Sequence, residues 1–320
     1  MTTIGKDISK AKQLLEAGEL VGIPTETVYG LAGNALDPKA VSKIFETKNR
    51  PSFDPLIIHT GSMEQISDYT AEIIPELEDL AHKFWPGPLT LLLPKKSIVP
   101  DLVTSGLDRV AVRVPSHPLT RELLLSLDFP LAAPSANPFG YISPTQASHV
   151  MDQLGGKIPY ILDGGSCEIG LESTIVGVEE GQIIIYRLGG VEVSAIKQVV
   201  GNVLILPQSS SNPKSPGMLK SHYAPRKPFV LGDLDQLVPH YLAKGKKFGL
   251  LSFQKAFEEV DAANQRVLSE KGDFREAAQH LFAAMRYLDQ QDVSVILSEE
   301  LPEKGLGKAI NDRLRRASAK

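Results

Sequence analysis

The chain has 320 residues, of which 42% are hydrophobic and 22% are charged, and its formal net charge is −4. This composition is ordinary for a globular protein, and the acidity excludes the strongly basic overall field of many nucleic-acid binders. The length favours two domains, because single hydrophobic cores stop growing near roughly 250–300 residues. The single cysteine, Cys167, excludes an internal disulfide and a cysteine zinc cluster within one chain.

The N-terminal twenty residues carry charges throughout and have no apolar h-region, which argues against a signal peptide. No apolar run approaches the roughly 18 residues of a membrane span. A lone cysteine also suits a reducing compartment. We therefore expect a cytoplasmic protein that has no membrane partner.

The first part of the chain alternates helical and strand patterns. Apolar residues at helical spacing predict helices at residues 9–18, 38–48, 72–84, 119–127 and 144–154. Short apolar runs predict strands at residues 20–23, 56–59, 89–93, 110–114, 160–162, 173–178 and 183–186. Several of these strands follow turns directly, so the fold class is α/β with a mixed sheet rather than a strict βαβ repeat.

Residues 207–227 break this pattern, because they are rich in serine, proline and lysine. Such composition is typical of a linker, although Lys220, His222 and Tyr223 also leave a lid over a ligand open as an interpretation. Beyond it, strands are predicted at residues 229–231, 248–252 and 293–297, with helices at 234–243, 274–288 and 307–319. The predicted domains are therefore 1–206 and a small parallel α/β unit at 228–320, joined by 207–227.

Several catalytic motifs are absent from the sequence, namely GxxxxGK[ST], HExxH, CxxC and GxSxG. Gly305-Leu306-Gly307 lacks the third glycine of a dinucleotide fingerprint, and no predicted strand directly precedes it. As the start of a helix it needs no ligand. Nothing near Cys167 suggests the lowered pKa of a nucleophile.

Cations stand where predicted elements end. Lys48 and Arg50 follow a helix, where they complement the helix dipole, but a proline-rich turn through Asp54 also holds them near a strand edge suited to phosphate. Arg109 and Arg113 lie four residues apart on one strand and so share a face. They need either a bound anion or acids between them, and Asp101 or Asp108 would serve.

Polar loops surround these cations. His59 ends an apolar strand, where a histidine is commonly a structural hydrogen-bonding group. Ser135 and Asn137 lie in a proline-bounded loop and either cap turns or face a ligand. Residues 163–174 contain three glycines, which permit close backbone approach to a ligand or simply make turns. Arg187 is a further cation at a strand end. These patterns favour nucleotide binding, but they do not name the reaction.

Seven ordered segments together resemble the YrdC-type threonylcarbamoyl-AMP synthases. They are PTETVYGL at residues 24–31, KNRP at 48–51, PLIIH at 55–59, WPGPLT at 85–90, VAVRVPSHP at 110–118, APSAN at 133–137 and LESTI at 171–175. SPGMLKSHYAP at residues 215–225, with the unit after it, resembles the long, two-domain form of that family. The resemblance covers nearly the whole chain.

The resemblance implies an open twisted sheet with a concave cationic cavity, followed by a smaller Rossmann-like domain. It implies condensation of L-threonine, bicarbonate and ATP into threonylcarbamoyl-AMP and pyrophosphate, with Mg²⁺ arriving on ATP and no protein-held metal. The residues expected to bind L-threonine are Thr27, His59, Arg113, Ala133 and Ser173. The residues expected to bind ATP are Lys48, Arg50, Asp54, Arg109, Ser135, Asn137, Ser143, Arg187 and Tyr223.

A downstream transfer complex would place the threonylcarbamoyl group on a tRNA adenosine. Three alternatives stay open: an RNA-binding module, in which a local cationic patch makes a weak RNA contact, a carbamoyl transferase and an inactive nucleotide sensor. The acidic net charge argues against the first. The lack of a cysteine cluster argues against the zinc-finger regions of the second. The full set of polar loop residues argues against the third.

Overall fold

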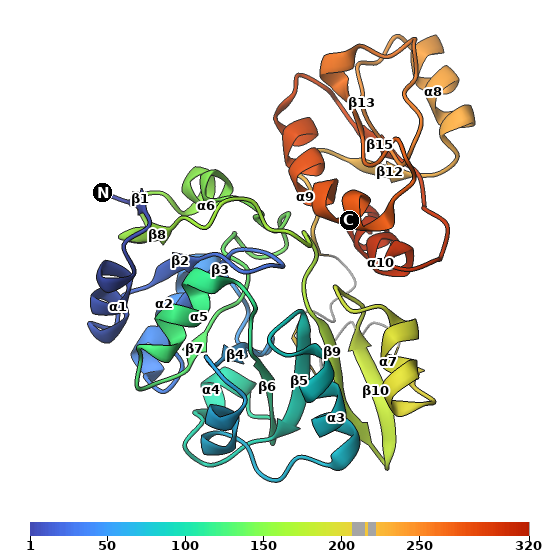
Figure 1. Cartoon of the computed structure of the whole chain (residues 1–320). Helices are drawn as coiled ribbons and strands as arrows, with labels where there is room; N and C mark the ends of the chain where they lie inside the picture. Colours follow the sequence, from blue (N-terminus) through green and yellow to red (C-terminus); the bar gives the residue numbers. More distant parts are fainter. Residues whose placement is uncertain (207–214, 217–221, 320) are drawn as a thin grey trace. The chain divides into compact units, whose positions relative to one another are not determined.

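The computed structural model describes residues 1–206, 215–216 and 222–319, which fall into two compact units (Figure 1). The first unit holds the described residues of 1–139, 144–168 and 172–219. The second unit holds residues 140–143 and 169–171 together with the described residues of 220–320. The domain boundaries expected from the sequence, at 206/207 and 227/228, stay a prediction.

The described residues of the first unit form an eleven-stranded sheet of mixed direction. Its strands, in order across the sheet, are β1 (Thr3–Gly5), β8 (Tyr160–Leu162), β2 (Val21–Ile23), β3 (Gly30–Asn34), β7 (Leu131–Ala132), β4 (Ile57–His59), β6 (Arg109–Arg113), β5 (Leu89–Pro94), β9 (Thr174–Glu179), β10 (Gln182–Arg187) and β11 (Leu204–Ile205). The pairs β4/β6 and β5/β9 are parallel, whereas β5/β6 and β9/β10 are antiparallel. The predicted mixed sheet is thereby confirmed.

The helices of the first unit are α1 (Ile8–Glu16), α2 (Pro38–Lys48), η1 (Glu64–Asp68), α3 (Pro75–Phe84), α4 (Asp101–Thr104), α5 (Pro118–Leu125), α6 (Ala147–Leu154) and α7 (Val193–Val200). Aspartates cap the starts of α1 and α2, and α2, α3 and α5 have a proline in the first turn. The predicted start of α3 at residue 72 is wrong, because Pro75 occupies the first turn and Ile74 before it is extended. Likewise α6 starts at Ala147 and not at 144, after an extended Gln146.

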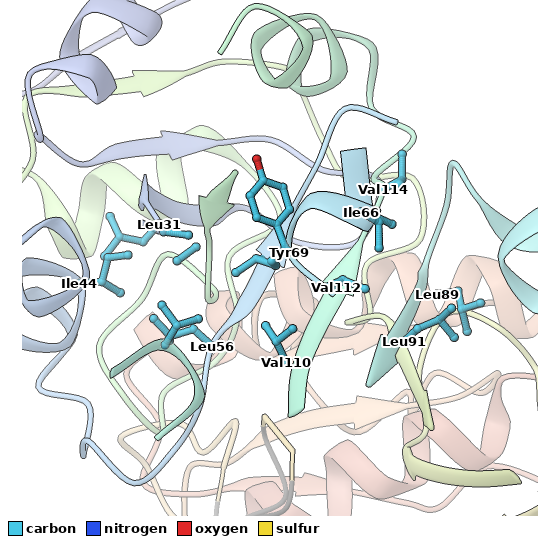
Figure 2. Packing of buried hydrophobic residues seen from close by; sticks show 14 of the residues in the cluster. Leu31, Ile44, Leu56, Ile66, Tyr69, Leu89, Leu91, Val110, Val112 and Val114 are labelled. Carbon is cyan, nitrogen blue, oxygen red and sulfur yellow. The ribbon is translucent and has the colours of Figure 1, made fainter. Parts of the chain in front are cut away.

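The main core lies on one face of this sheet. In Figure 2, Val110 and Val112 of β6, with Val114 directly after it, lie in one apolar cluster with Leu89 and Leu91 of β5. Successive side chains of a strand alternate between faces, so the residues between them belong to the other face. Ala111 and Leu92 accordingly pack in a separate, smaller cluster that also contains Ile57 and Ile175. We call the face that bears this smaller cluster the site face.

The second unit is built on an all-parallel sheet. Its described strands, in order, are β12 (Phe229–Leu231), β15 (Ile296–Ser298), β13 (Gly249–Ser252) and β14 (Gln265–Val267). Its helices are α8 (Leu234–Ala243), η2 (Ala262–Asn264), α9 (Phe274–Gln290) and α10 (Gly307–Ser318). The predicted parallel sheet is confirmed, but the last strand starts at Ile296 and not at 293, and β14 was not predicted. No helix in the described parts of the chain is both long and apolar enough to cross a membrane.

Candidate active site

Four polar side chains cross the site face on, or directly before, the neighbouring strands β4, β6, β5 and β9. They are His59, Arg113, Thr90 and Ser173, and at most 4% of each is exposed. His59 and Arg113 are register partners on parallel strands, and the hydroxyls of Thr90 and Ser173 lie 2.7 Å apart. We call these four residues the polar row. A buried row of this kind needs hydrogen-bond partners, either within the protein or from a ligand.

Arg113 is the centre of the polar row. Its Nε donates to the Gly87 carbonyl (3.1 Å), its Nη1 to the Thr27 hydroxyl (2.9 Å) and its Nη2 to Glu26 Oε1 (2.6 Å). A guanidinium has five N–H donors, so one N–H on each terminal nitrogen has no partner within the described residues. A guanidinium can bind the two oxygens of a carboxylate through one N–H of each terminal nitrogen.

Glu26 is therefore the acid that pairs with Arg113, and neither Asp101 nor Asp108 takes that place. Asp101 instead binds Lys95 at 2.5 Å. The sequence pattern missed Glu26 because it lies 87 residues from Arg113 along the chain. Its position inside the PTETVYGL segment, next to Thr27, was the available signal.

Ser173 connects the polar row to the predicted ATP residues. Arg187 donates from Nε and Nη2 to the Ser173 carbonyl (3.1 and 3.0 Å) and from Nη2 to its hydroxyl (3.0 Å). Thr90, the other partner of Ser173, was also missed from the sequence. The signal for Thr90 was a lone polar residue in the apolar strand LTLLL, whose alternation places it on the site face.

His59 is neutral at pH 7. Burial, and to a smaller extent the positive charge of Arg113 on the neighbouring strand, together lower the pKa of His59 to about 3. Its Nδ1 is buried without a hydrogen-bond partner in the described residues. Ala133 follows β7 next to the strand of His59, and its N–H donates to the Ile57 carbonyl at 3.1 Å. A neutral, unpartnered ring nitrogen can bind a polar group of a ligand.

Lys48 lies under the loop that follows β7. Its Nζ donates to the carbonyls of Ser135 (2.5 Å) and Asn137 (2.6 Å), and the side chain is fully buried. Burial lowers the pKa of Lys48 well below its usual range, and the nearby charge of Arg50 acts in the same direction. Both loop residues predicted to bind ATP are therefore fixed by one predicted cation.

Arg50 and Arg109 are each paired with an acid. Arg50 forms a buried ion pair with Asp54 (2.9 Å), so these two residues of the predicted nucleotide region lie together. Arg109 donates to Tyr186 Oη (2.9 Å) and lies 3.4 Å from Glu179 Oε1. Asp108, one of the two acids expected for this arginine, is 3.9 Å from its Nε and highly exposed, which makes that pair weak.

Two predicted ATP residues belong to the second unit. Ser143 is in segment 140–143, and its carbonyl accepts from Arg286 of α9 at 3.1 Å. Tyr223 is buried, with its ring centre 4.7 Å from the Arg316 guanidinium and 5.5 Å from the Phe282 ring. The remaining twelve predicted residues lie in the first unit. Lys220, which was considered as part of a lid, lies outside the described residues.

The thiol of Cys167 is buried, and burial raises its pKa above the usual range, which opposes thiolate formation. Within the described parts of the chain, no group of three or more histidine, cysteine, aspartate or glutamate side chains is placed to hold a metal ion.

Comparison with known proteins matches both parts of the chain. Residues 13–189 match the Sua5–YciO–YrdC family model, described as telomere recombination, and residues 191–319 match a model described as threonylcarbamoyl-AMP synthase, C-terminal domain. The threonylcarbamoyl-AMP synthase of Pyrococcus abyssi is 43% identical over 321 residues, which cover 96% of this chain and 93% of that protein. The Bacillus subtilis protein of the same name is 37% identical, with 99% and 94% covered. The crystal structure of P. abyssi Sua5 complexed with L-threonine has a TM-score of 0.93 at 41% identity and covers 99% of this chain and 97% of that chain.

Proposed function

Because the chain belongs to the Sua5–YciO–YrdC family and carries the threonylcarbamoyl-AMP synthase C-terminal domain, we propose that it condenses L-threonine, bicarbonate and ATP. The products are threonylcarbamoyl-AMP and pyrophosphate. The relatives of that name cover nearly all of this chain, and a relative's crystal structure contains L-threonine. The observation that carries the proposal is the pair of unpartnered N–H groups on buried Arg113.

L-Threonine occupies the polar row in this proposal. Its carboxylate accepts the two remaining N–H donors of Arg113, in a planar fork that a lysine would not provide. His59, which is neutral, offers Nδ1 to a polar group of the amino acid. Thr27, Ser173 and the backbone at Ala133 complete the threonine site.

ATP occupies the cationic region that the resemblance assigned to it. Arg187 contacts Ser173, so it would lie next to the threonine site and bind the phosphates of ATP. Arg109, with its acid partner Glu179, and the Arg50–Asp54 pair supply further charge. Lys48 acts by fixing the loop of Ser135 and Asn137, while Ser143 and Tyr223 stay predicted ATP residues. Within the first unit, these arginines and the loop of Ser135 and Asn137 would line the proposed concave cationic cavity.

The reaction needs positioning and charge neutralisation, and it does not need a protein nucleophile. The threonine amine takes up CO₂ from bicarbonate to give a carbamate, whose oxygen attacks the α-phosphorus of ATP as the bond to pyrophosphate breaks. Fixed arginines stabilise the charge that develops on the phosphate oxygens. Mg²⁺, when it enters with ATP, neutralises phosphate charge and orients the leaving group.

The product is an activated acyl-adenylate, so a second enzyme system must use it. We propose that a tRNA threonylcarbamoyl-transfer complex accepts it and modifies an adenosine beside the anticodon. The proposed compartment is the cytoplasm, where ATP, threonine and tRNA meet.

The test is pyrophosphate release from ATP, Mg²⁺ and bicarbonate, with and without L-threonine. We expect threonine-dependent release that Arg113→Ala reduces at least 100-fold, because a lost charge-assisted pair costs about 1.5–3 kcal/mol and the orientation of the substrate is lost as well. Arg315→Ala is the matched control, since Arg315 is exposed on α10 and pairs with Glu300 at 2.6 Å. Release that does not depend on threonine would contradict the proposal.

A further inference from the structure

Glu26 touches the centre of the polar row without being one of the predicted substrate residues. Its Oε1 lies 2.6 Å from Arg113 Nη2, and its Oε2 accepts the Ser116 N–H at 3.1 Å. Both side chains of the ion pair are only 4% exposed. A pair this deeply buried is fixed in geometry, because removing either charge would leave the other uncompensated.

The loop that carries Glu26 is itself rigidly held. The Thr25 hydroxyl lies 2.7 Å from the Thr27 hydroxyl, accepts the N–H groups of Thr27 and Val28, and donates to the Val28 carbonyl. The Pro24 carbonyl accepts the Thr120 hydroxyl. Glu26 and Thr27 therefore contact the Arg113 guanidinium from two fixed positions on one loop.

The charges near Arg113 decide which ligand fits. Glu26 cancels the charge of Arg113, and His59, the register partner of Arg113, carries no charge at pH 7. A ligand with no net charge keeps this buried group of charges balanced. At the Glu26–Arg113 pair, a ligand that brings only a carboxylate adds a second negative charge to one positive charge, and excess buried charge is costly.

We propose that Glu26 is a positioning residue that makes the site selective for a zwitterionic amino acid over a carboxylate that lacks an amine. Glu26 holds Arg113 ready for the substrate carboxylate, and its own charge favours the ammonium group that the substrate carries. The selection applies to binding, before the amine loses its proton. It rests on the proposed function, because it takes Arg113 as the partner of the threonine carboxylate.

The experiment compares two ligands by isothermal titration calorimetry on the full chain. One ligand is L-threonine, and the other is the dihydroxybutanoate that carries a hydroxyl in place of the ammonium group. We expect the unaltered protein to prefer L-threonine at least tenfold. Glu26→Gln removes the negative charge but keeps an acceptor for Ser116, and it should reduce that preference at least tenfold. Glu300→Gln is the matched control, since it neutralises the acid partner of Arg315, outside both proposed substrate sites, and should leave the preference unchanged.

Glu26→Asp keeps the charge, so it should rescue most of the preference, and it decides the question if Glu26→Gln does not fold. An unchanged preference in Glu26→Gln, or a lost preference in a folded Glu26→Asp, overturns the proposal. Arg113→Gln separates the two proposals. If Arg113→Gln loses threonine binding while Glu26→Gln keeps the preference, the proposed function stands and this inference fails. If Arg113→Gln binds threonine normally, both fail.

Discussion

His59 and Arg113 face each other as register partners on neighbouring parallel strands, and both side chains are almost completely buried. Protonation of His59 would place a second positive charge beside the guanidinium in a site that excludes water. Burial is the larger cause of its low pKa, and the charge of Arg113 is the second. Of these two side chains, only Arg113 is therefore charged at neutral pH.

The low pKa of His59 predicts that the free energy of unfolding falls at acid pH. The unfolded chain protonates His59 near its usual pKa of 6.5, whereas the folded chain does so only near a pKa of about 3. Since the unfolded state binds the extra proton, His59 lowers the free energy of unfolding by about 1.4 kcal/mol per pH unit as the pH falls from about 6 toward 4.

Urea denaturation at a series of pH values measures this effect. His59→Asn should have a shallower dependence than the unaltered protein over this range. His240→Asn, at an exposed position on α8, should keep the original slope. Equal slopes for His59→Asn and the unaltered protein would contradict the predicted pKa.

Tyr186→Phe should weaken use of ATP and leave threonine binding intact. The Tyr186 hydroxyl accepts from Arg109 (2.9 Å) and donates to Glu179 (3.0 Å), so its loss leaves the guanidinium less well oriented. We expect the KM for ATP to rise about three- to tenfold, in line with roughly 1 kcal/mol for one hydrogen bond. Initial-rate kinetics measure this KM, and calorimetry with L-threonine checks that threonine binding is intact. Tyr241→Phe in the second unit is the control, and an equal change there would rule out a specific role for Tyr186.

Lys48→Met should destabilise the protein. The substitution keeps the apolar stem but leaves the carbonyls of Ser135 and Asn137 without their donor, and an unsatisfied buried group costs about 1–3 kcal/mol. We expect the free energy of unfolding to fall by about 2–4 kcal/mol, as measured by urea denaturation. Lys39→Met, at an exposed position of the same helix, should change it little. A stable Lys48→Met variant would show that the loop does not depend on this lysine.

Gly189→Ala should displace the backbone at Ser173 and so weaken the binding of L-threonine. A Cβ at Gly189 would lie 2.3 Å from the Glu172 carbonyl oxygen and 2.5 Å from the Ser173 carbonyl carbon. Backbone atoms cannot rotate away, so the chain next to Ser173 must shift at a cost of about 1–3 kcal/mol. We expect the Kd for L-threonine to rise at least tenfold. Gly249→Ala, whose Cβ would meet only side chains at 3.4 Å or more, should bind normally.

Elements with strong local patterns were predicted well from the sequence. The bounds predicted for α2, α8, β8 and β12 are those of the structure. In these elements a proline or aspartate sets the start of a helix, or an uninterrupted apolar run defines a strand.

Short strands without an apolar run were missed. β3 has the sequence GLAGN, and β7 has only two residues. β7 pairs with β3 and β4, which are distant from it along the chain, and local propensity does not encode this register. Tertiary pairing therefore decided these elements.

The candidate site was likewise predicted only in part. Arg109 and Arg113 were placed on one strand face by their spacing, and the packing of Val110, Val112 and Val114 on the opposite face confirms it. The identity of the acids was not predictable, since Glu26 and Glu179 come from distant segments. The roles assigned to the site residues stay predictions.

The polar row has a consequence for folding. Its four members lie on, or directly before, four different strands, so a fragment that lacks any one of these strands lacks part of the proposed threonine site. A partly unfolded form that has released any of these strands has no affinity for the substrate. L-Threonine should consequently slow proteolysis throughout the central sheet and not only near the ligand, because a ligand that binds only the folded sheet stabilises the whole sheet against local unfolding.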